Sequence, residues 1–83
     1  MKMEHYLAAY DSETENLLEF VFSVPSALMR RVRDIAHVAP DDVEAIGSYP
    51  LSDDEAREIA KLLNKTLEFD KKAVFYLEPA PSE

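Results

Sequence analysis

The chain of 83 residues has two histidines, His5 and His37, and histidine is the residue type used most often in acid–base catalysis. Acid–base or nucleophilic catalysis by either histidine needs a positioned carboxylate or nucleophile beside it. The chain has no cysteine, and no serine lies in the strand–turn–helix context of a nucleophile elbow. His5 falls in an expected strand, and a charged His37 suits the C-terminal end of an expected helix. We therefore expect no catalytic residues and no enzyme activity.

Two acidic pairs, Asp41-Asp42 and Asp53-Asp54, are the only other groups whose spacing could serve chemistry. A calcium loop needs oxygen ligands at alternating positions around a glycine, and neither pair has that spacing. A phosphate-binding loop needs several glycines, and Gly47 is the only one. The sequence therefore predicts no metal and no cofactor. We interpret Asp53-Asp54 as helix capping, and Asp41-Asp42 with Glu44 either as a solvated loop or as a partner contact.

The charge of the chain favours some partners over others. Seventeen acidic residues stand against nine basic ones, for a formal net charge of −8. This charge repels phosphate backbones and anionic membranes, so we expect neither nucleic acid nor membrane as a partner. A basic protein would be attracted instead, although the charge could serve solubility alone. The basic cluster Arg30-Arg31-Arg33 is interpreted as a solvated helix face, with phosphate or acidic-helix binding as the alternative.

Compartment and domain organisation follow from length and hydropathy. One domain, residues 1–83, fits the chain length. No apolar run approaches the length that spans a bilayer, and no signal-peptide pattern is present. We expect a cytoplasmic protein, and a periplasmic form delivered by another route stays open.

A β-hairpin is predicted at the start of the chain. Residues 3–10 and 17–24 are rich in aromatic and aliphatic side chains, and the polar segment 11–16 between them is rich in turn formers. Alternation in the second strand predicts that four large side chains face the core: Leu18, Phe20, Phe22 and Val24.

Two helices should follow. Pro25 fits the first turn of a helix, capped by Ser23 or Ser26 and ending near His37. The segment 39–50 is irregular, with one helical turn from Asp41 that Gly47 would close. Ser52-Asp53-Asp54-Glu55 is a capping box that begins the second helix, and Asn64 is expected as its left-handed C-cap.

A third strand is predicted over residues 73–77, followed by a frayed tail at 79–83. The order β-β-α-α-β predicts an α+β fold with a three-stranded antiparallel sheet and both helices on one face. Such a sheet leaves its other face open. Alternation places three tyrosines and three glutamates there: Tyr6, Tyr10, Tyr76, Glu4, Glu19 and Glu78.

Rings surrounded by carboxylates suit a protein interface. The alternative is that tyrosines are good strand residues on a half-wet surface. Together with Asp41, Asp42 and Glu44, these residues form the predicted partner-binding set.

Several short motifs along the chain resemble those of a known family. They are Tyr10-Asp11, Glu13-Thr14-Glu15, Tyr49-Pro50-Leu51, Phe69-Asp70 and Phe75-Tyr76-Leu77-Glu78. The chain resembles a family of small uncharacterised bacterial domains, DUF7683, over almost its whole length, although Lys71-Lys72-Ala73-Val74 stands where a more aromatic stretch is expected. The family implies no established activity. In size, acidity and lack of cysteine, the chain is similar in type to immunity proteins of interbacterial toxin systems.

Three functional hypotheses follow. The first is an immunity protein or comparable inhibitor that occludes a basic toxin domain. The second is a regulatory or adaptor domain, monomeric or weakly homodimeric through an open sheet edge. The third is a small enzyme, which would need a pocket holding His5 or His37 beside a buried carboxylate.

Overall fold

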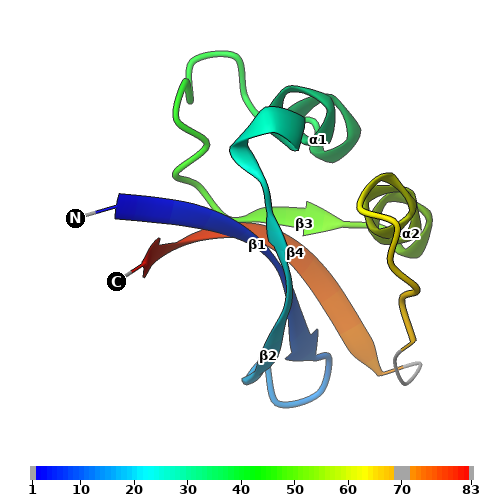
Figure 1. Cartoon of the computed structure of the whole chain (residues 1–83). Coiled ribbons are helices and arrows are strands. Elements are labelled where there is room, and N and C mark those ends of the chain that lie inside the picture. The colour runs from blue at the N-terminus through cyan, green and yellow to red at the C-terminus, as the bar shows by residue number, and fades with distance from the viewer. Residues whose placement is uncertain (1, 69–71, 83) are drawn as a thin grey trace.

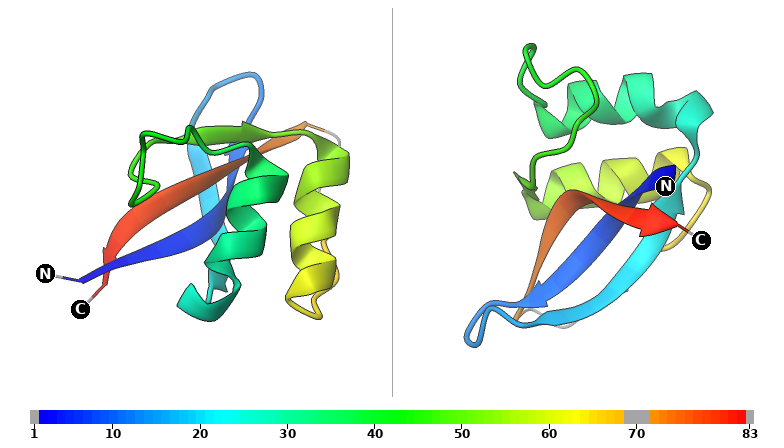
Figure 2. Two further views of the ribbon diagram at one scale, coloured as in Figure 1. Left: turned by 90° about the horizontal axis from the view of Figure 1, so that it is seen from above. Right: turned by 90° about the vertical axis from the view of Figure 1, so that its left-hand side faces the viewer.

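A computed structural model describes residues 2–68 and 72–82 and shows an α+β fold with two helices on one face of an antiparallel sheet (Figure 1). The strands are β1 (Lys2–Asp11), β2 (Leu17–Val24), β3 (Tyr49–Leu51) and β4 (Ala73–Ser82). The helices are α1 (Met29–Ala36), which follows the short 3₁₀ turn η1 (Ser26–Leu28), and α2 (Asp53–Leu62). Both helices lie side by side against the same face of the sheet (Figure 2).

The predicted hairpin and the α+β class are confirmed, whereas the predicted strand number and order are wrong. The sheet has four strands in the order β2-β1-β4-β3, and the elements follow one another as β-β-α-β-α-β. The missed strand, β3, is the segment Tyr49-Pro50-Leu51, whose first two residues belong to the segment expected to be irregular. It pairs with β4 from Tyr49 opposite Leu77 to Leu51 opposite Phe75. Pro50 is tolerated there because β3 is an edge strand.

The last strand is longer than expected, because β4 continues through Pro79 and Pro81 to Ser82. Its whole length pairs with β1, from Ala73 opposite Asp11 to Ser82 opposite Lys2. Most of the segment expected to be frayed is therefore strand. β3 pairs with β4 only from Phe75 to Leu77, so within the described residues β4 is an edge strand at its prolines, where proline is tolerated.

The helix boundaries agree with the sequence, but not all caps do. Ser52 and Glu55 form the predicted capping box, with Glu55 N–H donating to Ser52 Oγ at 3.1 Å and Ser52 N–H donating to Glu55 Oε1 at 2.8 Å. Asn64 has the predicted left-handed conformation, with φ of 57°. No side chain caps η1 or α1, so neither expected serine does so.

Apolar side chains fill the space between the helices and the sheet. On the strands, Leu7 and Ala9 of β1 lie opposite Leu77 and Phe75 of β4, and all are buried. From the helices, four further side chains close this core: Val32, Ala36, Ala56 and Ile59. We call this side of the sheet the inner face and the opposite side the outer face.

Two irregularities in the β1–β2 register overturn half of the core predicted for β2. Phe22 and Val24 pack at the core as expected. The register then shifts between Leu7 and Ala8 and again between Ala9 and Tyr10. An extra residue in one strand moves every later side chain to the other face. As a result Leu18 and Phe20 are 52% and 44% exposed instead of buried.

Two remaining expectations concern the segments between the elements. The segment 39–48 contains turns but no helical turn, and Ala45, rather than Gly47, has the left-handed conformation there, with φ of 52°. Phe69-Asp70 of the family motif and the terminal Glu83 lie outside the described residues. Within the described residues, no helix has the length and apolarity needed to cross a membrane.

Candidate protein-binding face

The outer face carries five of the six strand residues predicted to lie there. Because side chains alternate, the residues between the buried inner ones point outward: Tyr6 lies opposite Glu78, Ala8 opposite Tyr76, and Tyr10 opposite Val74. Glu4 is on the same face two residues before Tyr6. The alternation in the sequence therefore assigned these five side chains to the correct face of the sheet.

Glu19 is the exception. The shifted register pairs it with Ala9, and directly paired residues in an antiparallel sheet share a face. Because Ala9 is an inner residue, Glu19 belongs to the inner side, where it is exposed beyond the core. The structure does not bring it together with the tyrosines of the outer face.

Aromatic rings form a cluster on the outer face, composed of Tyr6, Tyr10, Phe20 and Tyr76. The ring centroids of Tyr10 and Tyr76 are 5.2 Å apart at an interplanar angle of 78°, which is an edge-to-face contact. Those of Tyr6 and Phe20 are 5.0 Å apart at 39°. Ala8 has no exposed surface although it points outward, because its cross-strand neighbours are Phe20 and Tyr76. The ring cluster thus consists of two ring pairs, one on each side of Ala8 in the middle of β1.

Carboxylates accept hydrogen bonds from the phenol groups at two edges of the ring cluster. Tyr6 donates to Glu4 Oε2 at 2.9 Å, and Tyr10 donates to Glu78 Oε1. Ser48 donates to the other oxygen of Glu78 at 3.0 Å. The hydrogen bond to Glu78, aided by desolvation, raises the pKa of Tyr10 to about 12. Each carboxylate still has lone pairs free to accept from a partner.

Among the strand side chains that the structure describes, the outer face carries no positive charge. The arginines of the chain all lie in the helices: Arg30, Arg31, Arg33 and Arg57. Among the strand residues whose side chains the structure describes, none is lysine or arginine. Lys72, next to β4, forms an ion pair with Glu13 at 3.2 Å. The glutamates of the outer face therefore face solvent without a cation from the described strands.

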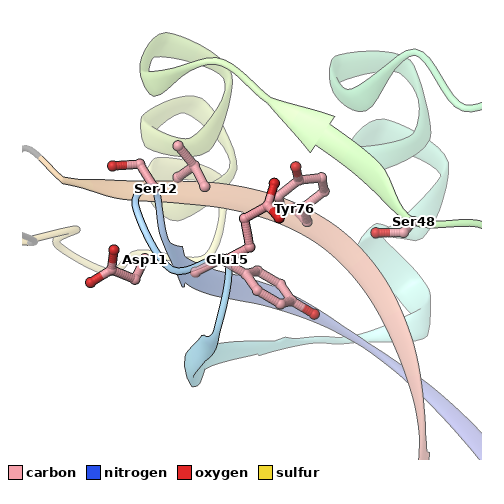
Figure 3. A pocket seen from close by; sticks show the side chains of 7 residues that line it. Asp11, Ser12, Glu15, Ser48 and Tyr76 are labelled. Carbon is pink, nitrogen blue, oxygen red and sulfur yellow. The ribbon is translucent and has the colours of Figure 1, made fainter.

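A hollow of about 400 Å³ opens on this face between the hairpin loop and Ser48. It is lined by the hairpin-loop residues Asp11, Ser12 and Glu15, by the outer-face residues Tyr10, Val74 and Tyr76, and by Ser48. Figure 3 shows Asp11 and Ser12 at one end and Ser48 at the other, with Glu15 reaching toward Tyr76. Sequence reasoning missed this hollow, because the packing of Ser48 beside β4 depends on the undetected strand β3.

Asp42, for which a solvated loop and a partner contact were both expected, organises the loop that contains it. Its carboxylate accepts hydrogen bonds from Ile46 N–H and Gly47 N–H, both at 2.9 Å, and from the Tyr49 hydroxyl at 2.5 Å. These bonds, led by the one from Tyr49, lower the pKa of Asp42. A side chain on Gly47 would lie 3.2 Å from both this carboxylate and the Tyr49 ring, so glycine permits their close approach.

Two more side chains hold the same loop from outside. Arg33 donates to the carbonyl oxygens of Asp42 at 3.0 Å and Val43 at 2.8 Å, so its guanidinium group is tied to this loop. His5 Nε2 lies 3.1 and 3.0 Å from the carbonyl oxygens of Glu44 and Ala45 and can donate to both. His5 is therefore positioned as a loop anchor.

The anchored loop presents apolar side chains to solvent. Val43 is 78% exposed and Ile46 is 64% exposed, and the acids Asp41 and Glu44 beside them are also exposed. His37, which precedes this loop, has a left-handed backbone, and its Nε2 lies 3.2 Å from Glu55 Oε2. Asp41 and Glu44 thus lie at a second surface, separate from the ring cluster.

The described residues contain no group of three or more histidine, cysteine, aspartate or glutamate side chains arranged to hold a metal ion. The hollow on the outer face contains neither histidine. What the outer face offers is contact area from rings, phenol and hydroxyl groups, and carboxylates. This combination can bind a protein surface by burial and charge pairing.

Comparison with known proteins places the chain in a family. A family model described as "Domain of unknown function (DUF7683)" matches residues 4–78, so the chain belongs to this family. The match spans both helices and runs from the Glu4 end of β1 to Glu78 in β4, and so contains the whole ring cluster. No curated protein and no solved structure matches the chain.

Proposed function

We propose that this member of the DUF7683 family is a non-catalytic protein-binding domain whose outer sheet face docks a basic protein, as an immunity protein or other inhibitor docks a toxin domain. The observation that carries this proposal is the ring cluster of Tyr6, Tyr10, Phe20 and Tyr76, flanked by Glu4 and Glu78 on a sheet face that neither helix covers. Tyrosines at the centre of a protein interface are frequent energetic hot spots.

The charges support a basic partner. The net charge of −8 would accelerate encounter with a positively charged protein, and the glutamates at the edges of the ring cluster would pair with its lysines and arginines. Inhibition would follow from occlusion, since basic groups that a toxin uses on its own substrate would be covered. The described strand side chains include no arginine or lysine, so the outer face would not repel such a partner.

A second candidate function rests on the free edge of β2. This edge strand of eight residues contains one charged residue, Glu19, and exposes Leu17, Leu18 and Phe20. Exposed apolar edge strands can pair with another strand, so a regulatory or adaptor domain that dimerises through β2 is the alternative. Repulsion between two chains that each carry −8 opposes such a dimer. Light scattering separates the two, since the alternative predicts a concentration-dependent dimer of the isolated chain.

Co-expression with the protein encoded beside this chain tests the main proposal. We expect a complex that co-purifies, relief of any toxicity of the neighbouring protein, and loss of both in the double variant Glu4→Lys/Glu78→Lys. The matched control is Asp34→Lys/Glu58→Lys, which makes the same change in net charge on exposed positions of α1 and α2. It should retain the complex.

A third variant is needed because the double variant could lose the complex by misfolding, since Glu78 accepts hydrogen bonds from Tyr10 and Ser48. Glu78→Gln removes the charge and keeps one of the two acceptor oxygens, so one of the hydrogen bonds from Tyr10 and Ser48 can remain. It should weaken the complex and change thermal unfolding by no more than the loss of one partly exposed hydrogen bond. Absence of any complex with the wild-type chain, or loss of the complex only in the helix variant, would refute the proposal.

A further inference from the structure

The hollow on the outer face has the composition of a socket for a cationic side chain. Carboxylates of Asp11 and Glu15 lie at its rim, Tyr10 and Tyr76 form its wall, and no lysine or arginine lines it among the described residues. Glu78, which accepts from Tyr10 and Ser48, adds a third negative charge directly behind two of the lining residues. An anion or a purely apolar group would be a poor match for this charge.

We propose that this hollow binds one arginine side chain of the protein partner, with the guanidinium group against the Tyr10–Tyr76 ring pair and its N–H groups directed at Glu15. The proposal rests on the function proposed above and names the residue type that would anchor it. It is argued from the charge complementarity between an acidic, ring-lined hollow and a planar cation.

The geometry of the rings favours arginine over lysine. Tyr10 and Tyr76 meet edge to face, so their rings present differently oriented surfaces to the hollow. A guanidinium group can stack on an aromatic ring while donating two parallel hydrogen bonds to a carboxylate, whereas an ammonium group is a compact, strongly hydrated charge. Serine hydroxyl oxygens of Ser12 and Ser48 provide further acceptors at the two ends of the hollow.

Of the carboxylates at the rim, Glu15 is the one available to a ligand. Asp11 Oδ1 already accepts from the N–H groups of Glu13 at 2.8 Å and Thr14 at 3.1 Å, and Lys72 is close enough to contribute to the lowered pKa of Asp11. Asp11 therefore shapes the hairpin turn. Glu15 is exposed and extends toward Tyr76 (Figure 3).

The backbone of Glu15 is itself unusual for its residue type. It has φ of 61°, a left-handed conformation that glycine or asparagine would adopt with less strain, and its N–H donates to the Asp11 carbonyl at 2.8 Å to close the turn. The backbone conformation of the turn therefore does not explain why glutamate occupies this position. Strained backbone that persists in a protein is often associated with a functional side chain.

Nuclear magnetic resonance titration with a single-guanidinium probe tests the socket. The probe is N-acetyl-arginine amide, compared with the neutral isostere N-acetyl-citrulline amide and with N-acetyl-lysine amide. We expect saturable shifts, with a dissociation constant in the millimolar range, for Tyr10, Glu15, Ser48, Val74 and Tyr76. Citrulline amide should give none, and lysine amide should bind more weakly than arginine amide.

Variants at Glu15 separate binding from folding. Glu15→Gly removes the carboxylate and relieves the left-handed backbone, so it should weaken probe binding by about threefold or more while the chain unfolds no more easily. Glu15→Lys should abolish probe binding. Glu58→Lys on α2 makes the same change in net charge as Glu15→Lys, but away from the hollow. Its affinity for the probe should stay close to that of the wild type, lowered only by the small effect of the changed net charge.

The other possible results show whether the arginine socket or the docking face is wrong. Shifts that are equal for citrulline amide, that spread over α1 and α2, or that survive in Glu15→Lys would overturn the arginine socket. If the probe fails but Glu4→Lys/Glu78→Lys still abolishes the protein complex, the socket is wrong and the docking face stands. If the probe binds in the hollow but that double variant keeps the complex, the docking face is wrong.

Discussion

The two faces of the sheet bury apolar groups in different ways. On the inner face, Leu7, Ala9, Phe75 and Leu77 pack against the helices with almost no exposed surface, and none of these side chains has a polar atom. On the outer face the rings of the ring cluster pack in two pairs, and two of its phenol groups donate to carboxylates. The inner face is closed by the chain itself, whereas the outer face meets solvent.

This difference separates the contributions of the faces to stability and to binding. Full burial of aliphatic groups is the main source of folding free energy in a small domain. Half-exposed rings with acidic partners gain less from folding and retain area and charge that a partner can use. We therefore expect inner-face substitutions to affect unfolding, and outer-face substitutions to affect complex formation.

Leu77→Ala should have the largest effect on stability. Leu77 has no exposed surface and lies in the middle of β4, between β1 and β3. Removing its side chain leaves a cavity in the core and should lower the free energy of unfolding by about 3 kcal/mol. Urea denaturation followed by circular dichroism measures this loss. A loss below about 1 kcal/mol would show that the inner face is not the stabilising one.

Tyr76→Ala, one residue earlier on the same strand, sharpens the comparison. Tyr76 points outward and is partly exposed, so the free energy of unfolding should fall by about 1 kcal/mol, well below the effect of Leu77→Ala. The same variant should lose binding to the basic partner. If Tyr76→Ala destabilises the chain as much as Leu77→Ala, the ring cluster belongs to the core and the separation fails.

Alkaline unfolding should depend on Tyr10. Its folded pKa of about 12 exceeds the ordinary value of 10.0 because Glu78 accepts its proton in a hydrogen bond. A raised folded pKa contributes stability that is complete below pH 10 and is lost as the pH rises toward about 12. Unfolding free energies measured across this range should fall more steeply for the wild type than for Tyr10→Phe. Equal slopes would show that the Tyr10–Glu78 bond is absent in solution.

Glu15→Gly should have the smallest effect on the free energy of unfolding, and it should raise this free energy whereas the preceding variants lower it. Relief of the left-handed backbone at φ of 61° should raise the free energy of unfolding by about 0.5 kcal/mol, after the greater flexibility of glycine in the unfolded chain is subtracted. Urea denaturation of the two proteins measures this change as a shift in midpoint, provided that the dependence of the unfolding free energy on urea concentration is the same in both. A clear destabilisation would mean that the Glu15 side chain supports the fold and is not free for a ligand.

Local signals in the sequence predicted the elements well. The capping box at Ser52, the left-handed Asn64 and the break at Pro25 depend on neighbouring residues only, so the pattern alone identifies them. Alternation also placed Tyr6, Tyr10 and Tyr76 on the outer face, because β1 and β4 pair along their whole length without a register shift.

The failures share one physical cause, which is long-range pairing. β3 has three residues and a proline, so only its contact with β4 makes it a strand. The register shifts that expose Leu18 and Phe20 and move Glu19 to the inner side arise between β1 and β2, and no residue in β2 signals them. Asp42 could be recognised as a loop anchor only after Tyr49 and Gly47 were located beside it.

Chemical-shift mapping of the complex with the co-purified basic protein tests the docking face most directly. The account predicts that the largest changes fall on outward-pointing residues of β1 and β4, centred on Tyr6, Tyr10 and Tyr76, with little change on the exposed faces of α1 and α2. A footprint centred on the helices, with the ring cluster unperturbed, would contradict it.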